Sequence, residues 1–370
     1  MTSSPAPFSW HGRRVLVTGH TGFKGSWLCL WLQHLGAEVH GFALPPATDP
    51  NLYELARIGD GLHSRFGDIR DLAALRQAIG EIRPQVVFHM AAQAIVRDSY
   101  EDPVGTFDTN VMGTVNLLEA VRQAGGVAAT VVVTSDKCYE NQELGRRFRE
   151  DDPMGGHDPY SASKGCSELV AASYARSFFA GEAGLGSLCT ARAGNVFGGG
   201  DWARDRLVPD LVRGFVDGHV PLIRRPEARR PWQHVLVPLS GYLLLAERLL
   251  RKTLPAWSGG WNFGPEAEDE RSVYEFVTML VEEWGEDCAV SFGAAGDMVH
   301  EATLLALDST RAHREIEWRP GWTLSRAVGE TVAWYKAYRD GADMRTVTIR
   351  QIEDFMRLRQ PIGAEARAPR

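Results

Sequence analysis

Residues 13–25 read RRVLVTGHTGFKG, a short apolar segment followed at once by a loop that contains three glycines. The apolar segment, Arg13 to Thr18, predicts a buried β-strand, and the pattern from Ser26 to Leu35 predicts a helix that ends at Gly36. A second apolar run, Glu38 to Ala43, predicts the next strand. A strand, a tight turn, a helix and a second strand of these lengths form the repeating unit of a parallel sheet.

The same alternation continues over roughly the first 190 residues. Further strands are expected at residues 86–89, 130–134 and 187–192, and helices at 72–79, 111–122 and 160–179. This order predicts an α/β fold with a doubly wound parallel sheet of the Rossmann type.

The pattern changes after Gly194, where glycine, proline and arginine become frequent and helices lack regular partner strands. We therefore expect a cofactor-binding domain at residues 1–194 and a smaller, mostly helical substrate lobe at 195–360. A buried helix at 236–250 and a short strand at 260–264 suggest that segments near 235–262 pack back onto the first domain. Residues 361–370 are expected to form a flexible tail.

Composition excludes several classes of protein. The 370 residues are 44% hydrophobic and 24% charged, with a net charge of −7, so nothing attracts the whole chain to nucleic acid or to an anionic membrane. Five scattered cysteines lack metal-ligand spacing and predict reduced thiols, no disulfide framework and no metal site. No apolar run is long enough to span a bilayer, and the first residues lack a signal core. We expect a cytoplasmic protein.

The glycine loop has the chemistry of a pyrophosphate site. Gly19, Gly22 and Gly25 would permit a tight turn and a close approach of the backbone to phosphate, at the N-terminus of a helix. A glycine triplet can also be a simple turn, but its place between a strand and a helix favours a dinucleotide. The spacing differs from G-x-G-x-x-G, and the acidic residue expected about twenty positions later is missing, so the loop alone leaves NAD and NADP open.

Tyr160 and Lys164 lie four residues apart at the start of a predicted helix, and hence on one face. A free phenol ionises near pH ~10, and a neighbouring ammonium together with an oxidised nicotinamide would favour the phenolate. The pair therefore predicts a base for hydride-transfer chemistry, and the alternative is a solvated helix face.

Ser135, Asp136 and Lys137 follow the apolar strand at 130–134, at the edge of the sheet where ligands gather. Alone, Asp136 and Lys137 would more simply form a surface ion pair. Beside Tyr160 and Lys164, an acid and an amine could remove water from the carbonyl compound that hydride transfer creates. The chemistry predicted is elimination, with oxidation as a temporary step.

Lysine is rare in this chain. Subtracting five lysines from the 40 basic residues leaves 35 arginines, yet Lys24, Lys137 and Lys164 all fall inside the motifs above. Arginine does not release its proton in a protein, whereas lysine does when its surroundings disfavour the charge, so these three positions are candidates for such a role. His89 and His234 lie beside apolar residues and are expected to be core groups.

A resemblance to a known family rests on GHTGFKGSW, HMAAQ, SDKCYEN, GGHDPYSASK, RAGNVFGGGDW, RPWQHV and WNFGP. Together these strings resemble the CDP-glucose 4,6-dehydratases, a family of extended short-chain dehydrogenase/reductases, from about Trp10 to Met356. Related dTDP-glucose and GDP-mannose dehydratases carry Asp-Glu or a lone Glu at the elimination site. The CDP-glucose family carries Asp-Lys, as this chain does at Asp136-Lys137.

The resemblance implies a catalytic set, a cofactor and a substrate. The implied catalytic residues are Ser135, Asp136, Lys137, Tyr160 and Lys164. The implied NAD contacts are Gly19, Thr21, Gly22, Phe23, Gly25, Asp68, Ile69, Ala91, Ala92 and Gln93, together with Tyr160 and Lys164. Ser135 would contact the sugar O4, and Asn195, Arg206 and Arg230 would hold the diphosphate of a nucleotide sugar. Asp68 could also be an ordinary turn or capping aspartate.

The expected reaction converts CDP-glucose to its 4-keto-6-deoxy product in deoxysugar biosynthesis, such as that of lipopolysaccharide O-antigen. Asp136 would act as acid and Lys137 as base at the elimination step, although the two labels could be exchanged. The resemblance also implies a homodimer or homotetramer, paired through helices near 111–122 and 160–179. Competing interpretations are a nucleotide-sugar epimerase, which does not need Asp136 and Lys137, and a non-catalytic NAD(P)-sensing protein, in which an intact Tyr160–Lys164 pair would be unexpected.

Overall fold

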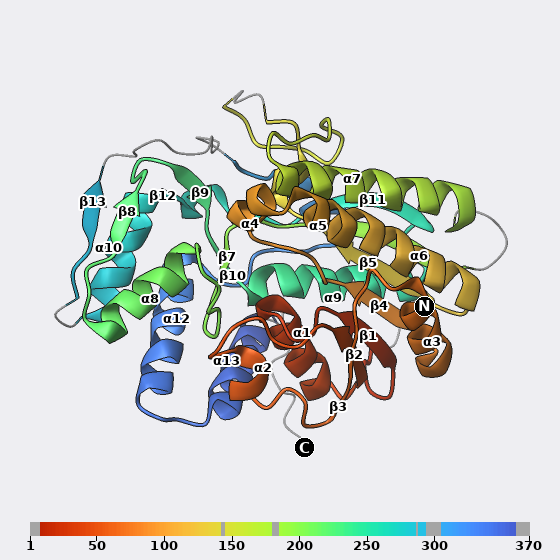
Figure 1. Cartoon of the computed structure of the whole chain (residues 1–370), viewed down its shortest axis with the longest axis horizontal. Coiled ribbons are helices and arrows are strands. Elements are labelled where there is room, and N and C mark those ends of the chain that lie inside the picture. Colours follow the sequence, from red (N-terminus) through yellow and green to blue (C-terminus); the bar gives the residue numbers. More distant parts are fainter. Residues whose placement is uncertain (1–7, 142–144, 180–184, 286–287, 294–304, 360–370) are drawn as a thin grey trace, which may run out of the picture.

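A seven-stranded parallel sheet forms the centre of the computed structural model, which describes residues 8–141, 145–179, 185–285, 288–293 and 305–359 (Figure 1). The strand order is β11-β6-β5-β4-β1-β2-β3, and every neighbouring pair is parallel. The strands are β1 (Arg14–Thr18), β2 (Glu38–Ala43), β3 (Leu62–Phe66), β4 (Val86–His89), β5 (Ala129–Val133), β6 (Ser187–Arg192) and β11 (Trp257–Asn262). From β1 the chain builds the sheet outward through β2 to β3, and it then continues on the other side of β1 with β4, as in doubly wound folds. Ligands are therefore expected at the carboxyl ends of the strands.

Helices cover both faces of the sheet (Figure 1). One layer consists of α3 (Leu72–Ile82), α6 (Gly113–Ala124) and α7 (Pro159–Tyr174), which share one apolar core with the sheet. The other layer contains α1 (Phe23–His34) and α9 (Leu236–Leu250), with α13 (Met344–Arg359) against α1. The remaining helices on this part of the chain are α2 (Leu52–Leu55), α4 (Val96–Glu101), α5 (Pro103–Phe107), the π-helical turns η1 (Asp108–Met112) and η3 (Ala175–Phe179), and the 3-10 turn η2 (Asp136–Cys138).

The second lobe contains helices and three small two-stranded sheets, drawn in green to blue in Figure 1. Its elements are β7 (Val196–Phe197), α8 (Leu207–Asp217), β8 (Leu222–Arg224), β9 (Arg229–Pro231), β10 (Gln233–His234), η4 (Ala267–Asp269), β12 (Glu270–Ser272), α10 (Val273–Trp284), β13 (Ser291–Gly293), α11 (Thr310–Glu315) and α12 (Leu324–Arg339). The lobe shares one continuous apolar core with the α1 and α9 side of the sheet.

Helix α1 explains why the chain after the glycine loop is so apolar. It is buried on all sides from Gly25 to Leu32, because the sheet lies on one side and α9 and α13 pack on others. A helix that is apolar all round is stable only when it is enclosed in this way. The glycine loop at its start is therefore anchored on a rigid element.

The predicted fold class is confirmed, and the strands expected at 38–43, 86–89 and 187–192 and the helix at 236–250 have the predicted bounds. The expected return of a later segment also occurs, because β11 lies beside β6 and α9 contacts β5 and β6. The sequence did not predict β3 or the small sheets of the second lobe. The domain boundary at 194/195 stays a prediction. Within the described residues, no helix is long and apolar enough to cross a membrane.

Candidate active site

The glycine loop is folded so tightly that two of its glycines have no room for a side chain. Gly19 has a φ of +75°, and a Cβ atom there would lie 2.7 Å from the amide nitrogen of Ala91. A Cβ atom on Gly25 would lie 2.0 Å from the carbonyl oxygen of Gly19. Gly22 precedes the first turn of α1 and provides no side-chain cap for its N–H groups. These donors and this cradle fit the pyrophosphate of a dinucleotide.

The neighbouring strand end supports the loop through Thr18, which the sequence analysis did not select. The Thr18 hydroxyl accepts hydrogen bonds from the amide groups of Met90, at 3.1 Å, and Ala91, at 3.2 Å. It also lies 2.8 Å from Nδ1 of His89, whose burial lowers its pKa to about 3. His89 is thus a buried group of the fold, as predicted. Thr18, which it contacts, holds the segment that carries Ala91 and Ala92.

The other predicted cofactor residues lie around this cradle. The Thr21 hydroxyl donates to the carbonyl oxygen of Leu44 at 2.8 Å, and the backbone N–H of Gln93 donates to Oδ1 of Asn110 at 2.9 Å. Ile69 is buried against Gly113. Asp68 is part-exposed and accepts hydrogen bonds from the backbone N–H and the guanidinium of Arg70. The shortest of these contacts, from Nη2 of Arg70 to Oδ2 of Asp68, is 2.6 Å. The helix cap that follows is Asp71, so Asp68 does not cap α3, and its contact with the cofactor stays a prediction.

Tyr160 and Lys164 lie in the first turns of α7, which begins at Pro159 after the N-cap Asp158. Both side chains are buried, and Nζ of Lys164 lies 6.0 Å from the centre of the Tyr160 ring. A side-chain hydrogen bond joins Tyr160 to Ser135. The predicted pair, Tyr160 and Lys164, therefore lies next to the end of β5, where Tyr160 contacts Ser135.

Burial shifts both groups away from their ordinary ionisation. It raises the pKa of Tyr160 to about 12, against the hydrogen bond from Ser135, and lowers the pKa of Lys164 to about 8. Without a cofactor, loss of water around the phenolate outweighs the other influences on Tyr160, so the ammonium does not by itself lower the pKa of the phenol. The positive ring of an oxidised nicotinamide would supply the missing stabilisation.

Asp136 is only 2% exposed and has two neutral partners. Its Oδ1 accepts from the Ser135 hydroxyl at 3.0 Å, and its Oδ2 accepts from Nδ2 of Asn195 at 3.3 Å. Burial raises its pKa, although Lys137, Ser135, Arg230 and Lys24 act in the opposite direction. The raised pKa favours the acid form of this carboxyl, which can donate a proton. Gly194 leaves it room, because a Cβ atom there would lie 1.7 Å from Oδ2.

Lys137 follows in the turn η2 and is half-buried. Its backbone N–H donates to the Ser135 hydroxyl at 3.2 Å. Its positive charge lowers the pKa of Asp136, against the larger effect of burial. Acid and amine are thus neighbours at the carboxyl edge of β5, next to Tyr160. Their separate roles stay predictions.

Of the three predicted diphosphate ligands, two have charged groups beside them. Nη1 of Arg206 lies 3.0 Å from Oδ2 of Asp201, and Arg206 also acts on Tyr160. Arg230 is 8% exposed and acts on Asp136. Asn195, in a left-handed conformation with φ +48°, donates to Asp136. Asn195 and Arg230 thus interact with Asp136, and Arg206 interacts with Tyr160.

Comparisons with known proteins agree with this geometry. Residues 15–251 match the model of the NAD dependent epimerase/dehydratase family. The CDP-glucose 4,6-dehydratase of Salmonella typhimurium is 50% identical over 351 residues, which cover 94% of this chain and 97% of that protein. The chain belongs to the NAD dependent epimerase/dehydratase family.

Two other known proteins resemble the chain over nearly its whole length. The dTDP-glucose 4,6-dehydratase of Streptomyces griseus is 33% identical and covers 88% of this chain with 94% of its own. The crystal structure of DesIV, a dTDP-glucose 4,6-dehydratase from Streptomyces venezuelae with NAD and TYD bound, is 25% identical with a TM-score of 0.73. It covers 90% of this chain and 99% of its own. Family membership confirms NAD as the predicted cofactor.

Several groups near the catalytic residues were missed as site residues. Asn110, in the π-helical turn η1, donates through Nδ2 to the Gln93 carbonyl at 3.0 Å and to the Ser163 hydroxyl at 2.8 Å, and so ties the cofactor segment to α7. Lys24 and Tyr242 also face the catalytic groups. Only Lys24 gave a signal in the sequence, as one of the few lysines, because the contacts of Asn110 and Tyr242 join distant segments.

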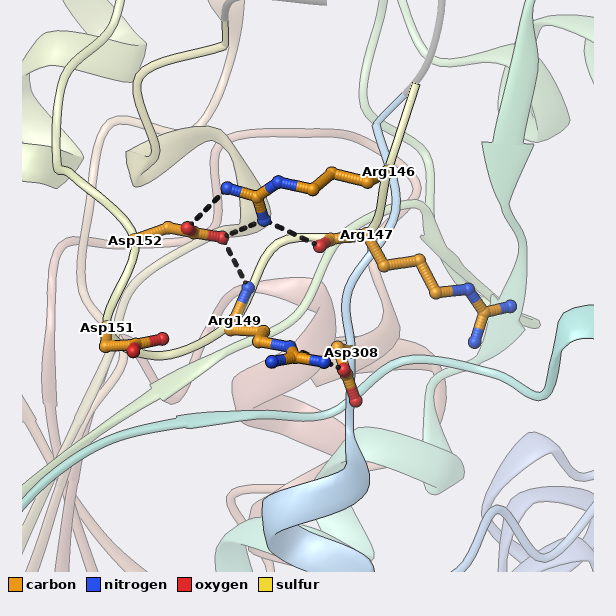
Figure 2. Close-up of a pocket in the computed structure, with 6 residues that line it drawn as sticks. All are labelled: Arg146, Arg147, Arg149, Asp151, Asp152 and Asp308. Atoms are coloured by element: carbon orange, nitrogen blue, oxygen red, sulfur yellow. Dashed lines mark hydrogen bonds and ion pairs between the residues drawn. The ribbon is translucent and has the colours of Figure 1, made fainter. Parts of the chain in front are cut away.

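Two other polar features lie away from the catalytic residues. An open hollow of about 500 Å³ is lined by arginines and aspartates that pair with one another, including Arg146 with Asp152 (2.6 Å between Nη2 and Oδ1) and Arg149 with Asp308 (3.2 Å), as Figure 2 shows. At the opposite, amino edge of the sheet, ligand atoms of Glu38, His40 and His63 lie within 4.8 Å of one another, a cluster that the sequence did not predict.

Proposed function

We propose that the chain is a CDP-glucose 4,6-dehydratase, which forms CDP-4-keto-6-deoxy-glucose and water with NAD as a catalytic cofactor. The observation that carries this proposal is the buried Asp136, which burial favours in its acid form, directly before Lys137 and beside Ser135 and Tyr160. The 50% identity to the Salmonella typhimurium enzyme of that name supports the same substrate. An epimerase of the family would not need the Asp136–Lys137 pair.

NAD, which the loop with Gly19, Gly22 and Gly25 would hold, would supply the hydride acceptor for C4 of the sugar and the hydride donor for C6. Tyr160, as phenolate, takes the proton of the 4-hydroxyl, and Ser135 holds the same oxygen by hydrogen bonding. The 4-ketone makes the C5 proton acidic, and the neutral amine of Lys137 removes it. Asp136 gives its proton to the departing 6-hydroxyl, which leaves as water, and a proton then returns to C5. When Lys164 is charged, its ammonium stabilises the phenolate form of Tyr160.

The substrate diphosphate would meet Arg206 and Arg230, with Asn195 beside Asp136 as a neutral donor. Guanidinium groups bind phosphate oxygens in a fixed fork, so they orient the sugar as well as attract it. Asp201 holds Arg206 in place at 3.0 Å. The cytosine base is proposed from the similarity alone.

The decisive experiment is isotopic. CDP-glucose carrying deuterium at C4 should yield a product that has lost one water and carries the deuterium at C6 of the same molecule, as shown by mass spectrometry and NMR. Deuterium in free NADH, or no loss of water, would contradict the proposal. Parallel reactions with dTDP-, UDP- and GDP-glucose test the base.

A second test separates oxidation from elimination. In Lys137→Met, C4 oxidation should continue, so absorbance of reduced cofactor should accumulate on the enzyme while dehydrated product does not form. A wild-type rate of product formation in this variant would exclude Lys137 as the base. Asp136→Asn is its matched partner for the acid role.

We propose further that two copies of the chain pair through α6 and α7. Helix α7 and its neighbours α5, η1 and η3 leave apolar side chains exposed. Val104 on α5 is 78% exposed and Leu169 on α7 is 61% exposed, and Met112 and Phe178 are also exposed. Such a surface is typical of a subunit interface. Leu169→Glu should convert a dimer to a monomer in light scattering, whereas a wild-type chain that is monomeric would exclude this pairing.

All five cysteines are free thiols, which is in keeping with the reducing cytoplasm that we propose as the site of action. A deoxysugar product of this kind would serve the synthesis of surface polysaccharides such as O-antigen. Deletion of the gene, followed by sugar analysis of the surface polysaccharide, tests that assignment.

A further inference from the structure

Three side chains that can bind a metal ion gather at the amino ends of β2 and β3, at the edge of the sheet opposite to the catalytic residues. Glu38 and His40 lie on β2 and His63 lies on β3, and one ligand atom of each lies within 4.8 Å of the other two. We call these three residues the amino-edge cluster. The proposed dehydration uses none of them.

The pairing of the two strands explains why these side chains meet. His40 is directly opposite His63 in the parallel register of β2 and β3, and Glu38 precedes His40 by two residues. Side chains two residues apart on a strand point to the same face of a sheet, so all three emerge together. Phe42, two residues further along β2, is buried on this face in the core that contains α3. The cluster therefore lies on the α3 face of the sheet.

The cluster opens to solvent beside the last turn of α3. Glu38 and His40 line an open hollow of about 510 Å³ together with Ile82 and Arg83 from the end of that helix. His63 is exposed. A hydrated ion can therefore reach the cluster without any movement of the backbone.

The two imidazole rings are already side by side. The rings of His40 and His63 are stacked, with centroids 4.7 Å apart and planes inclined by 21°. Oε1 of Glu38 lies 3.0 Å from Nε2 of His40. Burial lowers the pKa of His40, with Glu38 acting in the opposite direction, and this favours the neutral imidazole that binds metals.

The charges around the hollow distinguish its two carboxylates. Glu81 is engaged in an ion pair with Arg65. Nε of Arg14 donates to the carbonyl oxygen of Arg83 at 3.1 Å. Glu38 has an imidazole of the cluster as its partner, so it is the carboxylate that can turn to a cation held by the two rings.

Two imidazoles and one carboxylate form a ligand set of divalent transition metals. Imidazole nitrogen suits Zn²⁺, Cu²⁺ and Ni²⁺, and a water molecule takes the fourth position of a tetrahedral Zn²⁺ site with three protein ligands. Bonds of about 2.0–2.2 Å at tetrahedral angles place ligand atoms roughly 3.4 Å apart, so side-chain movements of about 1 Å are sufficient here. Mg²⁺ and Ca²⁺ prefer oxygen ligands and do not match this set.

We propose that Glu38, His40 and His63 bind a divalent transition-metal ion of the Zn²⁺ class, which joins the edge strand β3 to β2. Strand β3 is at the end of the sheet, and its polar side chains are exposed, so backbone pairing with β2 holds it in place. A metal bond between side chains of the two strands would add a second link. The inference is independent of NAD binding and of dehydration.

The proposed link also bears on the predicted cofactor contacts. Five residues after His63 the chain reaches Asp68, roughly 16 Å further along if it stays extended, and then Ile69. A metal at the amino end of β3 would therefore act on the fixation of the strand that leads to these residues, and would take no part in the chemistry.

Calorimetric titration with zinc sulfate tests the site directly. Wild type should bind one Zn²⁺ per chain at the cluster, and His63→Gln and His40→Gln should each raise the dissociation constant of this ion at least about tenfold. Loss of a mere second-layer partner of a metal ligand already costs about 10–100-fold in affinity. Glu38→Gln keeps both rings and the shape of the side chain, and should also weaken binding.

His34 provides a matched control. Its Nε2 lies 3.7 Å from Oε1 of Glu353, so it is a surface histidine beside a glutamate, but it belongs to no group of three metal-binding residues in the described parts of the chain. His34→Gln should keep the wild-type dissociation constant for Zn²⁺. Titration with magnesium sulfate should give no binding at the cluster.

Hydrogen exchange tests the link between the strands. Zn²⁺ should slow amide exchange in β2 and β3 of wild type about tenfold or more, because the ion stabilises the form in which the strands are paired. The same addition should leave exchange in His63→Gln unchanged. Circular dichroism of each variant without metal confirms that the exposed substitutions leave the fold intact.

Four results would overturn the inference. If Zn²⁺ binds wild type no more tightly than His63→Gln, or if His34→Gln weakens binding as much, the cluster is not the site. If Mg²⁺ binds as well as Zn²⁺, the imidazoles do not select the ion. If Zn²⁺ binds at the cluster without slowing exchange in β3, the ion does not join the two strands.

Discussion

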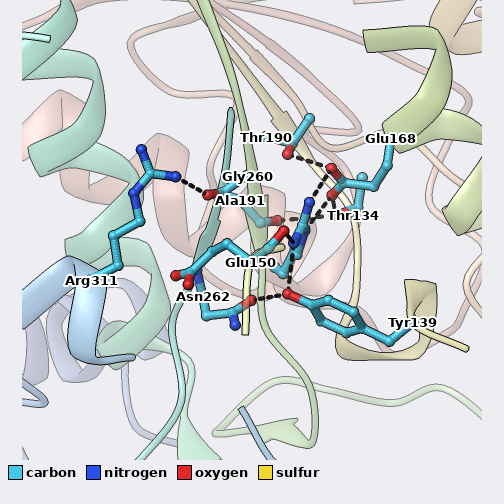
Figure 3. Close-up of polar contacts among 10 residues, drawn as sticks. Thr134, Tyr139, Glu150, Glu168, Thr190, Ala191, Gly260, Asn262 and Arg311 are labelled. Atoms are coloured by element: carbon cyan, nitrogen blue, oxygen red, sulfur yellow. Dashed lines mark hydrogen bonds and ion pairs between the residues drawn. The ribbon is translucent and has the colours of Figure 1, made fainter. Parts of the chain in front are cut away.

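Two buried ionic clusters lie at neighbouring strands of the same sheet, and they have opposite properties. One joins Glu168 on α7 to Arg192 at the end of β6, with both side chains 4% exposed (Figure 3). The other surrounds Asp136 at the end of β5. Burial acts against ionisation in both, yet the pKa of Glu168 is lowered and that of Asp136 is raised.

Hydrogen bonding explains the difference. Both Glu168 oxygens accept from Arg192, at 2.9 and 2.8 Å, and each also accepts from a threonine hydroxyl, Thr134 or Thr190. Arg192 in turn donates to the Tyr139 hydroxyl at 2.6 Å. Asp136 has only a serine hydroxyl and a longer contact from Asn195, and no cation bonded to it in the described structure. The first cluster is a completed ion pair, and the second is left able to exchange a proton.

Removal of the cation from the first cluster should have the largest effect on stability. In Arg192→Met, Glu168 would remain buried without its charge partner, so the free energy of unfolding should fall by about 3–5 kcal/mol. Urea denaturation followed by circular dichroism measures this loss. A loss below about 1 kcal/mol would mean that Glu168 is not ionised in the folded protein.

Removal of the acid from the second cluster should affect rate and leave folding intact. Asp136→Asn keeps the shape and the hydrogen bond from Ser135 but cannot protonate the leaving hydroxyl, so the rate of dehydration should fall about a hundredfold to a thousandfold. Steady-state assays of the keto product measure it, with the urea midpoint as control. Retention of most of the activity would remove Asp136 from the chemistry.

Two glycines make room for these clusters and allow a matched pair of substitutions. A Cβ atom on Gly194 would lie 1.7 Å from Oδ2 of Asp136, and one on Gly260 would lie 2.1 Å from Nη2 of Arg192. Gly194→Ala should lower the rate about tenfold to a hundredfold, because it displaces the acid. Gly260→Ala should lower the free energy of unfolding by about 1–3 kcal/mol and leave the rate nearly unchanged. The reverse pattern would show that the two clusters have been assigned the wrong roles.

The sequence predicted the second cluster better than the first. Ser135, Asp136 and Lys137 are adjacent and follow an apolar strand, and Tyr160 and Lys164 are one helical turn apart, so local pattern places them. Glu168 and Arg192 meet only because α7 packs on β6, and the spacing of residues in the sequence does not predict such a contact.

The same limit applies to the parts of the fold and site that were missed. Tyr242 is 218 residues from Lys24, its partner. Strand β3, LHSRF, was missed because it is an edge strand whose polar residues are exposed, and only its register with β2 makes it a strand. Apolar periodicity identifies buried elements, whereas an edge strand is formed by backbone pairing alone.

The smallest expected effect concerns the pH dependence of stability, and the two clusters should differ in sign. The folded-state pKa of Asp136 is raised, so its favourable contribution is fully present below the unfolded value of ~3.9 and is lost as the pH rises through the folded value. At pH 7 burial of this carboxyl therefore destabilises the folded state relative to the unfolded state, in which the carboxylate is ionised and hydrated, and Asp136→Asn should be slightly more stable than wild type. Its advantage should shrink as the pH falls toward 4.

Glu168 contributes in the opposite direction because its folded-state pKa is lowered. Its stabilisation is present above the unfolded value of ~4.3 and is lost only as the pH falls through the lower folded value. In Glu168→Gln the deficit relative to wild type should therefore be constant from pH 7 to 5 and shrink at more acidic pH. Urea midpoints of both variants across this range provide the measurement. If both differences changed with pH in the same direction, Asp136 would be an ordinary ion pair like Glu168, and its place as the proton donor would be lost.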